Sequence, residues 1–273
     1  MKAVRPPAVA GSFYPDDPAM LRAVVDDFLE GARPAPCAQW PKAIIAPHAG
    51  YIYSGPVAAS AYATLTPAAG HVERVVLVGP SHFVPFRGVA APRAEAFTTP
   101  LGEVPVDSAA VEAIRDLPQV TIADGPHGEE HALEVQLPFL QVVLGAVAVV
   151  PLAVGDARPA EVAEVLARLW GGAETLIVVS SDLSHYHPED VARRMDDATA
   201  TAIEALEGAR LGPEDACGFL AVAGFLAEAK ARRLRVERLD LRTSGDVSGF
   251  TRRVVGYGAW AFRDNGTGPA ATA

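Results

Sequence analysis

Cysteine is scarce in this sequence, which contains only Cys37 and Cys217 among its 273 residues. Two cysteines exclude a disulfide framework, so the fold must rest on a hydrophobic core. The opening residues also lack the apolar segment of a secretory signal peptide. We therefore expect a reduced, cytoplasmic protein in which Cys217 is either a small buried side chain or a metal ligand.

Long apolar runs and concentrated positive charge are absent too. The longest apolar stretch, Val142–Val154, is interrupted by Gly145 and Pro151 and is shorter than the roughly 20 residues that span a bilayer. The formal net charge is −10, and Lys and Arg are scattered apart from a short cluster at Arg232–Arg238. These features argue against a membrane protein and against a nucleic-acid-binding surface.

Motifs for two common chemistries are missing. The sequence has no P-loop and no Gly-x-Gly-x-x-Gly after an apolar run, so nucleotide binding is not predicted. It also has no Gly-x-Ser-x-Gly elbow. Ser181, Asp182, Ser184 and His185 crowd a single loop instead of converging from separate elements, which disfavours a serine hydrolase triad.

Apolar β-branched runs alternate with segments of helical period along the chain. This alternation predicts a single α/β domain over residues 1–263, with a central, largely parallel or mixed sheet covered by helices on both faces. The polar tail, 264–273, is expected to be disordered. The expected strands are 43–46, 74–78, 146–150, 175–179, 235–241 and 254–262. The expected helices are 18–30, 56–65, 108–116, 129–144, 159–170, 190–206 and 213–231.

Histidines follow three of these expected strands. "AIIAPH" ends in His48, "RVVLVGPSH" ends in His82, and "TLIVVSSDLSH" ends in Asp182 and His185. The carboxyl ends of parallel strands meet at one edge of a sheet, where ligands bind in open α/β folds. Pro47 and the glycines that follow His48 are expected to hold it on a rigid turn before a helix.

Two imidazoles with one further anionic ligand and open positions are typical of a non-haem iron(II) site. His48 and His82 are the first two candidates. The spacing leaves the third ligand open among several candidates: Asp182, His185, Cys217 or a glutamate of "EEHALE". Tyr51 and Tyr53 either line the same pocket or are half-buried tyrosines with hydrogen-bonded hydroxyl groups.

The segment "PHGEEHALE" carries a competing signal. His127, Glu130 and His131 match the H-x-x-E-H pattern of a zinc protease helix, in which both histidines bind zinc. Pro126 and Gly128 place His127 at or before the start of the helix, which disfavours a shared face. The other interpretations are a polar helix face or a His131 that reaches the strand-end crevice as an acid–base group.

Six motifs occur in one order along the chain: "PAVAGSFYP" at 7–15, "PHAGYIYSG" at 47–55, "GPSH" at 79–82, "EHALEVQLPFL" at 130–140, "VVSSDLSHY" at 178–186 and "ACG" at 216–218. Together they resemble the Memo family, the mediator of ErbB2-driven cell motility in animals and protein B of the AmmeMemoRadiSam system in bacteria and archaea. The resemblance runs from about Val4 to Trp260. It implies a fold similar to the class III extradiol dioxygenases, which hold iron with two histidines and a glutamate.

Carried across motif by motif, the resemblance implies that His48, His82 and Cys217 are the metal ligands. Iron(II) is the expected metal, with copper or zinc as alternatives. A thiolate in place of the dioxygenase glutamate changes the charge and softness of the site, so ring cleavage is not inferred from the fold.

The remaining motif residues are assigned to the same pocket. We expect three catalytic groups: His131, Asp182 and His185. We expect four residues to contact the substrate: Tyr51, Tyr53, Ser81 and Glu130.

These assignments predict a metal-dependent oxidoreductase with dioxygenase-like chemistry, in which His185 or His131 moves a proton. A second hypothesis is a non-catalytic adaptor whose pocket binds a peptide or a small ligand. A third is a zinc hydrolase built on His127 and His131. The resemblance also implies association with a radical-SAM protein and an AMMECR-type protein.

Overall fold

Short aliphatic and β-branched runs form the central sheet, because such side chains pack well on both of its faces. The computed structural model describes residues 3–32 and 39–264. Cys37 lies outside these residues. So does the tail predicted to be disordered, except for Asp264. The strands of the main sheet are β2 (Ala43–Ala46), β3 (Arg74–Pro80), β4 (Val89–Ala91), β7 (Val120–Ile122), β8 (Ala148–Val154), β9 (Thr175–Ser180), β10 (His185–His187), β11 (Arg235–Thr243) and β12 (Val254–Arg263).

The main sheet is mixed, with a parallel centre. Its strand order is β10-β12-β2-β9-β3-β8-β4-β7, and β11 pairs with β12. The four central strands β2, β9, β3 and β8 are parallel and almost wholly buried, whereas β12 joins β2 and β4 joins β8 in antiparallel fashion. A second sheet contains three short strands: β1 (Val4–Arg5), β5 (Ala96–Thr99) and β6 (Gly102–Pro105).

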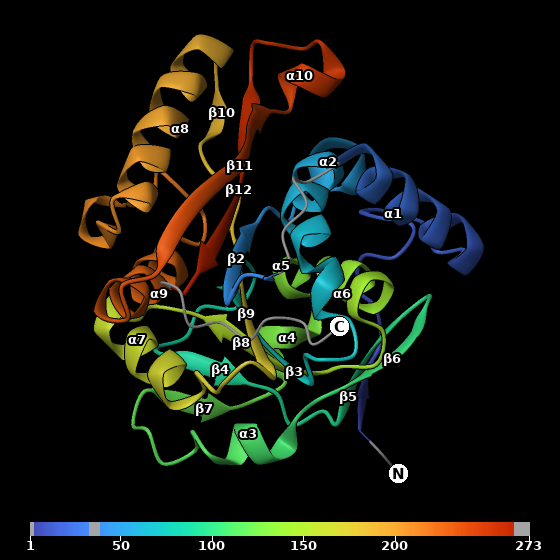
Figure 1. Ribbon diagram of the computed structural model, residues 1–273, viewed down its shortest axis with the longest axis vertical. Helices are drawn as coiled ribbons and strands as arrows, with labels where there is room; N and C mark the ends of the chain where they lie inside the picture. The colour runs from blue at the N-terminus through green and yellow to red at the C-terminus, as the bar shows by residue number, and fades with distance from the viewer. Residues whose placement is uncertain (1–2, 33–38, 265–273) are drawn as a thin grey trace.

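Helices cover both faces of the main sheet, as the alternating pattern predicts (Figure 1). They are α1 (Pro18–Ala32), α2 (Tyr51–Tyr62), α3 (Ser108–Glu112), α4 (Gly125–Gly128), α5 (His131–Glu134), α6 (Leu137–Leu144), α7 (Pro159–Arg168), α8 (Glu189–Glu204), α9 (Phe219–Ala231) and α10 (Gly245–Ser248). On one side α7 and α9 pack against each other, and on the other α1, α2 and α6 form a layer. Within the described ranges, no helix has the length and apolar content needed to cross a membrane.

Helix α2 begins at Tyr51, earlier than the predicted start at Pro56. The prediction treated Gly55 as part of the turn, but it lies inside the helix. A Cβ atom at Gly55 would lie 2.3 Å from the ring of Phe28. Gly55 therefore permits the close approach of α1 and α2, and the turn between β2 and α2 is shorter than expected.

Two other predicted helices start or continue differently. The expected helix over residues 129–144 is divided into α5 and α6. Pro138 lies in the first turn of α6. Because proline has no N–H, it cannot donate the hydrogen bond that would continue α5 into α6. The expected helix from Pro213 begins only at Phe219. A Cβ atom at Gly218 would lie 2.9 Å from the Ser180 carbonyl, so this glycine brings Cys217 against the end of β9.

Several short strands were not predicted. β1, β4, β5, β6, β7 and β10 contain between two and four residues each. Such segments are too short to show an alternating pattern in the sequence. Their pairing depends on neighbours distant in the chain.

Candidate metal centre

The carboxyl ends of three neighbouring strands meet at one edge of the main sheet. β2, β9 and β3 lie side by side and parallel, so the loops that follow them open at the same place. These loops carry His48, Asp182 and His82. His131 joins them from the start of α5, which packs against β3. Four chemically active side chains far apart in the sequence are thereby brought to one edge.

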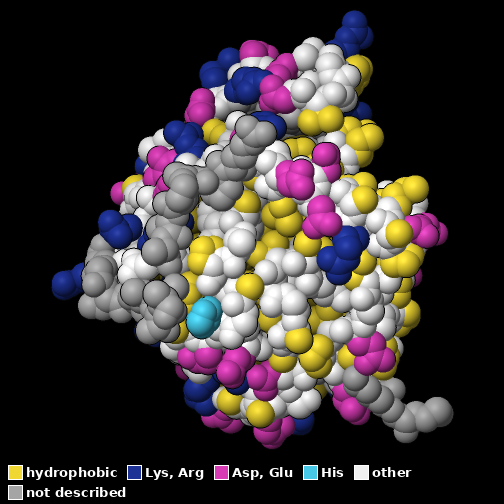
Figure 2. Space-filling model, turned by 45° about the vertical axis from the view of Figure 1, so that its right-hand side comes forward, with side chains coloured by type: hydrophobic (Ala, Val, Ile, Leu, Met, Phe, Trp, Pro, Cys, Tyr) yellow, Lys and Arg dark blue, Asp and Glu magenta, His cyan; other side chains and the backbone are white. Residues whose placement is uncertain are grey.

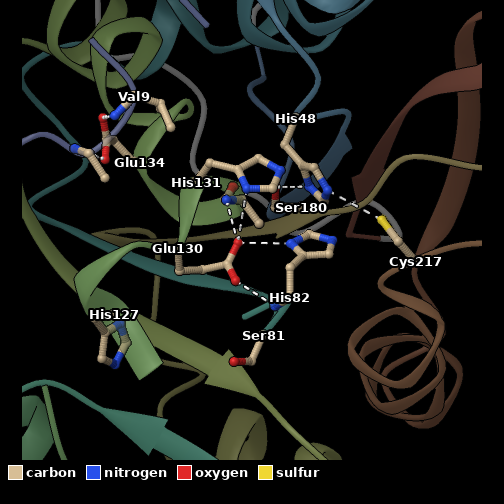
Figure 3. A network of polar contacts seen from close by, with 12 residues as sticks. Val9, His48, Ser81, His82, His127, Glu130, His131, Glu134, Ser180 and Cys217 are labelled. Carbon is tan, nitrogen blue, oxygen red and sulfur yellow. Dashed lines mark hydrogen bonds and ion pairs between the residues drawn. The ribbon is translucent and has the colours of Figure 1, made fainter. Parts of the chain in front are cut away.

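Three imidazoles form a compact cluster at this edge. One ring nitrogen from each of His48, His82 and His131 lies within 4.8 Å of the other two (Figure 3). The ring centroids are 4.7 Å apart for His82 and His131, 5.2 Å for His48 and His82, and 5.4 Å for His48 and His131. The sequence predicts an acid–base role for His131 or, in the zinc alternative, ligation together with His127; in the structure His131 joins His48 and His82 in a set that can hold a metal.

Ser180, the last residue of β9, fixes the tautomer of His48. The Ser180 hydroxyl donates its single hydrogen to the Ala132 carbonyl at 2.6 Å and accepts from Gln136 Nε2 at 2.8 Å. Its 2.9 Å contact with His48 Nδ1 must then be a bond that His48 donates. Tyr62 in turn donates to Gln136 Oε1 at 2.8 Å. His48 therefore carries its hydrogen on Nδ1, and its Nε2 lone pair faces Cys217 Sγ at 3.2 Å.

Glu130 supports His82 from behind and lies close to His131. Its Oε1 accepts from His82 Nδ1 at 2.9 Å and from Ala132 N at 2.8 Å, and its Oε2 accepts from His82 N at 2.6 Å. His131 Nδ1 lies 3.5 Å from the same Oε1. Burial opposes ionisation of Glu130, but the bonds and charge of His82 and the Ala132 amide outweigh it and lower the pKa to about 2. A carboxylate behind a histidine is the usual support of a metal ligand.

His48 and His131 are neutral at physiological pH. Burial, and next the charge of His82, hold the pKa of His48 well below its ordinary value. Burial, and next the charge of His48, lower the pKa of His131 to about 4. Neutral imidazole is the form that binds metal ions, so both rings are ready to do so without losing a proton.

Cys217 lies beside the cluster. Its Sγ is 3.2 Å from His48 Nε2 and accepts from the Asp182 amide at 3.3 Å. Burial, and next the charge of Asp182, raise the pKa of the thiol to about 12. The metal-free protein therefore keeps the thiol protonated, and a metal that bound the sulfur would displace that proton.

Asp182 and His185, which the sequence predicts to be acid–base groups, lie beside the imidazole cluster. Asp182 Oδ1 accepts from the His48 amide at 2.7 Å, and burial raises the pKa of its carboxyl group. His185 Nδ1 donates to the Leu183 carbonyl at 2.7 Å, which leaves Nε2 free. Both residues line a cavity of about 670 Å³ together with the three clustered imidazoles and Cys217. That volume suits a small molecule.

The four residues expected to contact substrate are not among those that line the cavity. Tyr51 is buried and its hydroxyl donates to the Val135 carbonyl at 2.7 Å. Tyr53 is exposed on α2, and Ser81 donates to the Val84 carbonyl. Glu130 is buried behind His82 and His131.

His127 and His131 do not form the predicted zinc protease pair. His127 belongs to α4 and is buried, and its Nε2 bonds to the Ala90 carbonyl at 3.1 Å. Figure 3 shows its ring apart from the three clustered imidazoles. The break between α4 and α5 separates the two histidines into different elements.

Four residues that shape the site were not predicted from the sequence. Ser180 and Gln136 orient His48, and Phe13 and Tyr186 line the cavity. The signal for Ser180 was a hydroxyl at the end of an apolar run, "TLIVVS". Gln136 was a polar residue within "HALEVQLPFL", where apolar neighbours predict burial.

Comparisons with known proteins agree with the order of the motifs. A family model described as Memo-like protein matches residues 5–261. A MEMO1 family protein from Archaeoglobus fulgidus is 35% identical over 276 residues, covering 95% of this chain and 100% of that protein. A MEMO1 family protein from Thermotoga maritima is 38% identical over 273 residues, covering 93% and 97%. A solved structure of an uncharacterized protein from Escherichia coli K12 has a TM-score of 0.48 and 15% identity, covering 78% of this chain and 98% of that one. By its family-model match and its relatives, the chain belongs to the family of Memo-like proteins.

Proposed function

We propose that this protein is a metal-dependent enzyme whose metal ion is held by His48, His82 and His131. The observation that carries the proposal is the cluster of ring nitrogens within 4.8 Å of one another. The support of Nδ1 by Ser180 and Glu130 directs Nε2 of His48 and His82 toward the ion. Imidazole ligands suit iron, copper and zinc, and we propose iron or copper first.

Cys217 is the fourth ligand in this proposal. Its Sγ lies 3.2 Å from His48 Nε2, a separation at which two ligand atoms can share one ion. Thiolate ligation favours iron, copper or zinc over magnesium and calcium. The sequence-derived ligand set of His48, His82 and Cys217 is thereby kept and extended by His131.

A bound iron or copper ion would supply redox chemistry, so the proposed activity is that of an oxidoreductase acting on a small molecule. The chain supplies the proton transfers. Asp182 is buried at the cavity wall and burial raises the pKa of its carboxyl group, so this group can take up and release a proton there. His185, with Nε2 free, can accept one or return it.

Metal content tests the proposal directly. We expect near-stoichiometric iron or copper in protein purified without oxygen, loss of the metal in His48→Ala, and weaker retention in Cys217→Ala. His71→Ala is the matched control, because His71 is exposed and stacks on Trp40, away from the cluster. If neither the natural protein nor any variant binds a transition metal, the metal proposal fails. A ligand-binding adaptor then becomes the better hypothesis.

A zinc hydrolase is the second candidate function. Its zinc ligands would be His48, His82 and His131 instead of the pair His127 and His131. Three neutral imidazoles with an open position also form the ligand set of catalytic zinc sites. A zinc ion would supply hydrolysis instead of redox chemistry. Stoichiometric zinc together with no consumption of oxygen would favour this candidate, whereas bound iron or copper with substrate-dependent oxygen consumption would exclude it.

A further inference from the structure

Tyr186 has a left-handed backbone conformation that no helix end accounts for. Among the described residues, three other than glycine have a positive φ: Tyr186 at 62°, Leu206 at 55° and Arg233 at 59°. Leu206 and Arg233 lie just beyond the ends of α8 and α9, where a left-handed residue commonly ends a helix. Tyr186 lies within β10 and ends no helix.

A bulge in β10 produces this conformation. His185 pairs with Val255 of β12, but His187 pairs with Val254, so the register shifts between them. One extra residue, Tyr186, is therefore left out of the antiparallel ladder. Bulges next to active sites commonly redirect a side chain.

The side chain of Tyr186 is directed to the cavity and not into the core. It is 62% exposed and lines the cavity that holds the three imidazoles. Its ring centroid is 5.7 Å from that of His185, and the Arg253 guanidinium lies 5.1 Å from its centre. Core packing thus does not offset the strained backbone, and strain kept without such compensation is typical of functional sites.

Phe13 provides a second aromatic ring on the same cavity. Its centroid is 4.7 Å from that of His131. The backbone there is fixed, because the Phe13 carbonyl accepts from Tyr51 N at 2.8 Å and the adjacent Tyr14 hydroxyl donates to the buried Glu134 at 2.5 Å. The cavity thus carries one aromatic ring beside His131 and another beside His185.

We propose that Tyr186 is a ligand-contacting residue that, together with Phe13, binds the planar, apolar part of a small molecule. This inference rests on the proposed function, in which the metal-binding group of the same molecule reaches the imidazole cluster. The bulge serves to present the Tyr186 ring at the mouth of the cavity. The cavity volume of about 670 Å³ accommodates a ligand of this size.

Two hydroxamic acids test the contact. Benzohydroxamic acid and acetohydroxamic acid share a metal-binding group, and only the first carries a ring. We expect metal-loaded natural protein to bind benzohydroxamic acid more tightly than acetohydroxamic acid. In Tyr186→Ala the ratio of these two affinities should fall about fivefold to tenfold, which is the size of one aromatic contact. Tyr186→Phe and the control Phe250→Ala should keep it, since Phe250 is exposed and does not line the cavity. An unchanged preference in Tyr186→Ala would overturn the inference.

A metal-free measurement separates this inference from the proposed function. Saturation transfer from metal-stripped protein to the ring protons of benzohydroxamic acid should be strong in the natural protein and weak in Tyr186→Ala. Such a result supports the ring contact even if metal analysis shows that the proposed function is wrong. Equal transfer in the two proteins, or transfer in neither, overturns the ring contact whatever the metal content.

The stability of Tyr186→Gly adds a second criterion. Glycine adopts positive φ without strain, so we expect this variant to melt at a higher temperature while the preference for the benzo compound is lost. A lower melting temperature would show that the tyrosine stabilises the fold, and it would overturn a role based on strain retained for ligand contact.

Discussion

Replacing Ser180 by alanine should weaken metal binding although the serine is not itself a ligand. The Ser180 hydroxyl makes three hydrogen bonds: to His48 Nδ1, to Gln136 Nε2 and to the Ala132 carbonyl. Without it, the His48 Nδ1–H loses its acceptor in a fully buried position. The imidazole is then free to rotate or to change tautomer, and its Nε2 lone pair is no longer directed at the cluster.

The expected loss of metal affinity follows from the hydrogen bonds that the Ser180 hydroxyl makes. Removing the hydrogen-bond partner of a metal-ligating histidine typically lowers metal affinity about 10-fold to 100-fold, which is about 1.4 to 2.7 kcal/mol. The Gln136 amide also loses a partner, so we expect the free energy of unfolding to fall by about 1 to 3 kcal/mol. Metal affinity is measured by competition with a chelator of known strength, and stability by denaturant unfolding of the metal-free protein.

Ser184→Ala is the matched control. Ser184 lies in the loop beyond β9 and is buried like Ser180, but its polar contact is with Asp196 and not with the imidazole cluster. The same substitution there should leave metal affinity unchanged. If Ser180→Ala binds metal as tightly as the natural protein, or if both variants lose affinity equally, the assigned tautomer of His48 does not control the site.

The other two predictions concern stability. Asp196 is buried, its Oδ1 accepts from Ser184 N and its Oδ2 has no partner, and burial raises its pKa to about 6. Because this folded-state pKa lies above the unfolded value of 3.8, the contribution of Asp196 to the stability of the natural protein is lost as the pH rises from about 4 through 6. We expect Asp196→Asn to raise the unfolding free energy at pH 7 by up to about 3 kcal/mol. Urea unfolding at pH 4 and pH 7 checks this, and an equal gain at both values would contradict it. For Gly224→Ala, a Cβ atom would lie 2.5 Å from Val162 Cβ and 2.9 Å from the Pro159 carbonyl, so α7 and α9 would be forced apart. We expect a loss of about 1 to 3 kcal/mol in thermal or denaturant unfolding, and an unchanged midpoint would count against this packing.

The strand-end pattern predicted much of the site, because the direction of parallel strands fixes where their loops meet. His48, His82 and Asp182 each follow an apolar run, and each lines the cavity. The position of His131 depends instead on a helix that breaks between α4, α5 and α6. Periodicity treated residues 129–144 as one helix, and the motif paired His131 with His127, so neither indicated that His131 lies beside His48 and His82.

Tertiary contacts decided the features that the sequence left open. Tyr51 looked like a pocket residue, yet its ring packs on Tyr14 and Phe139 in the core. The bulge that presents Tyr186 depends on pairing with β12, and no local pattern in "SHYH" indicates it. Local propensity carries no information about such partners, which come from distant parts of the chain.

The position of β9 in the sheet governs when the centre can form during synthesis. His48, His82 and His131 all precede residue 132, but β2 and β3 are not neighbours: β9, at Thr175–Ser180, lies between them. A nascent chain that ends before β9 contains all three imidazoles and lacks both the strand that aligns them and Ser180. Under the proposed function, the expected order is therefore that the carboxyl-terminal half of the chain first emerges and inserts its strand, and that metal is captured by the assembled sheet afterwards.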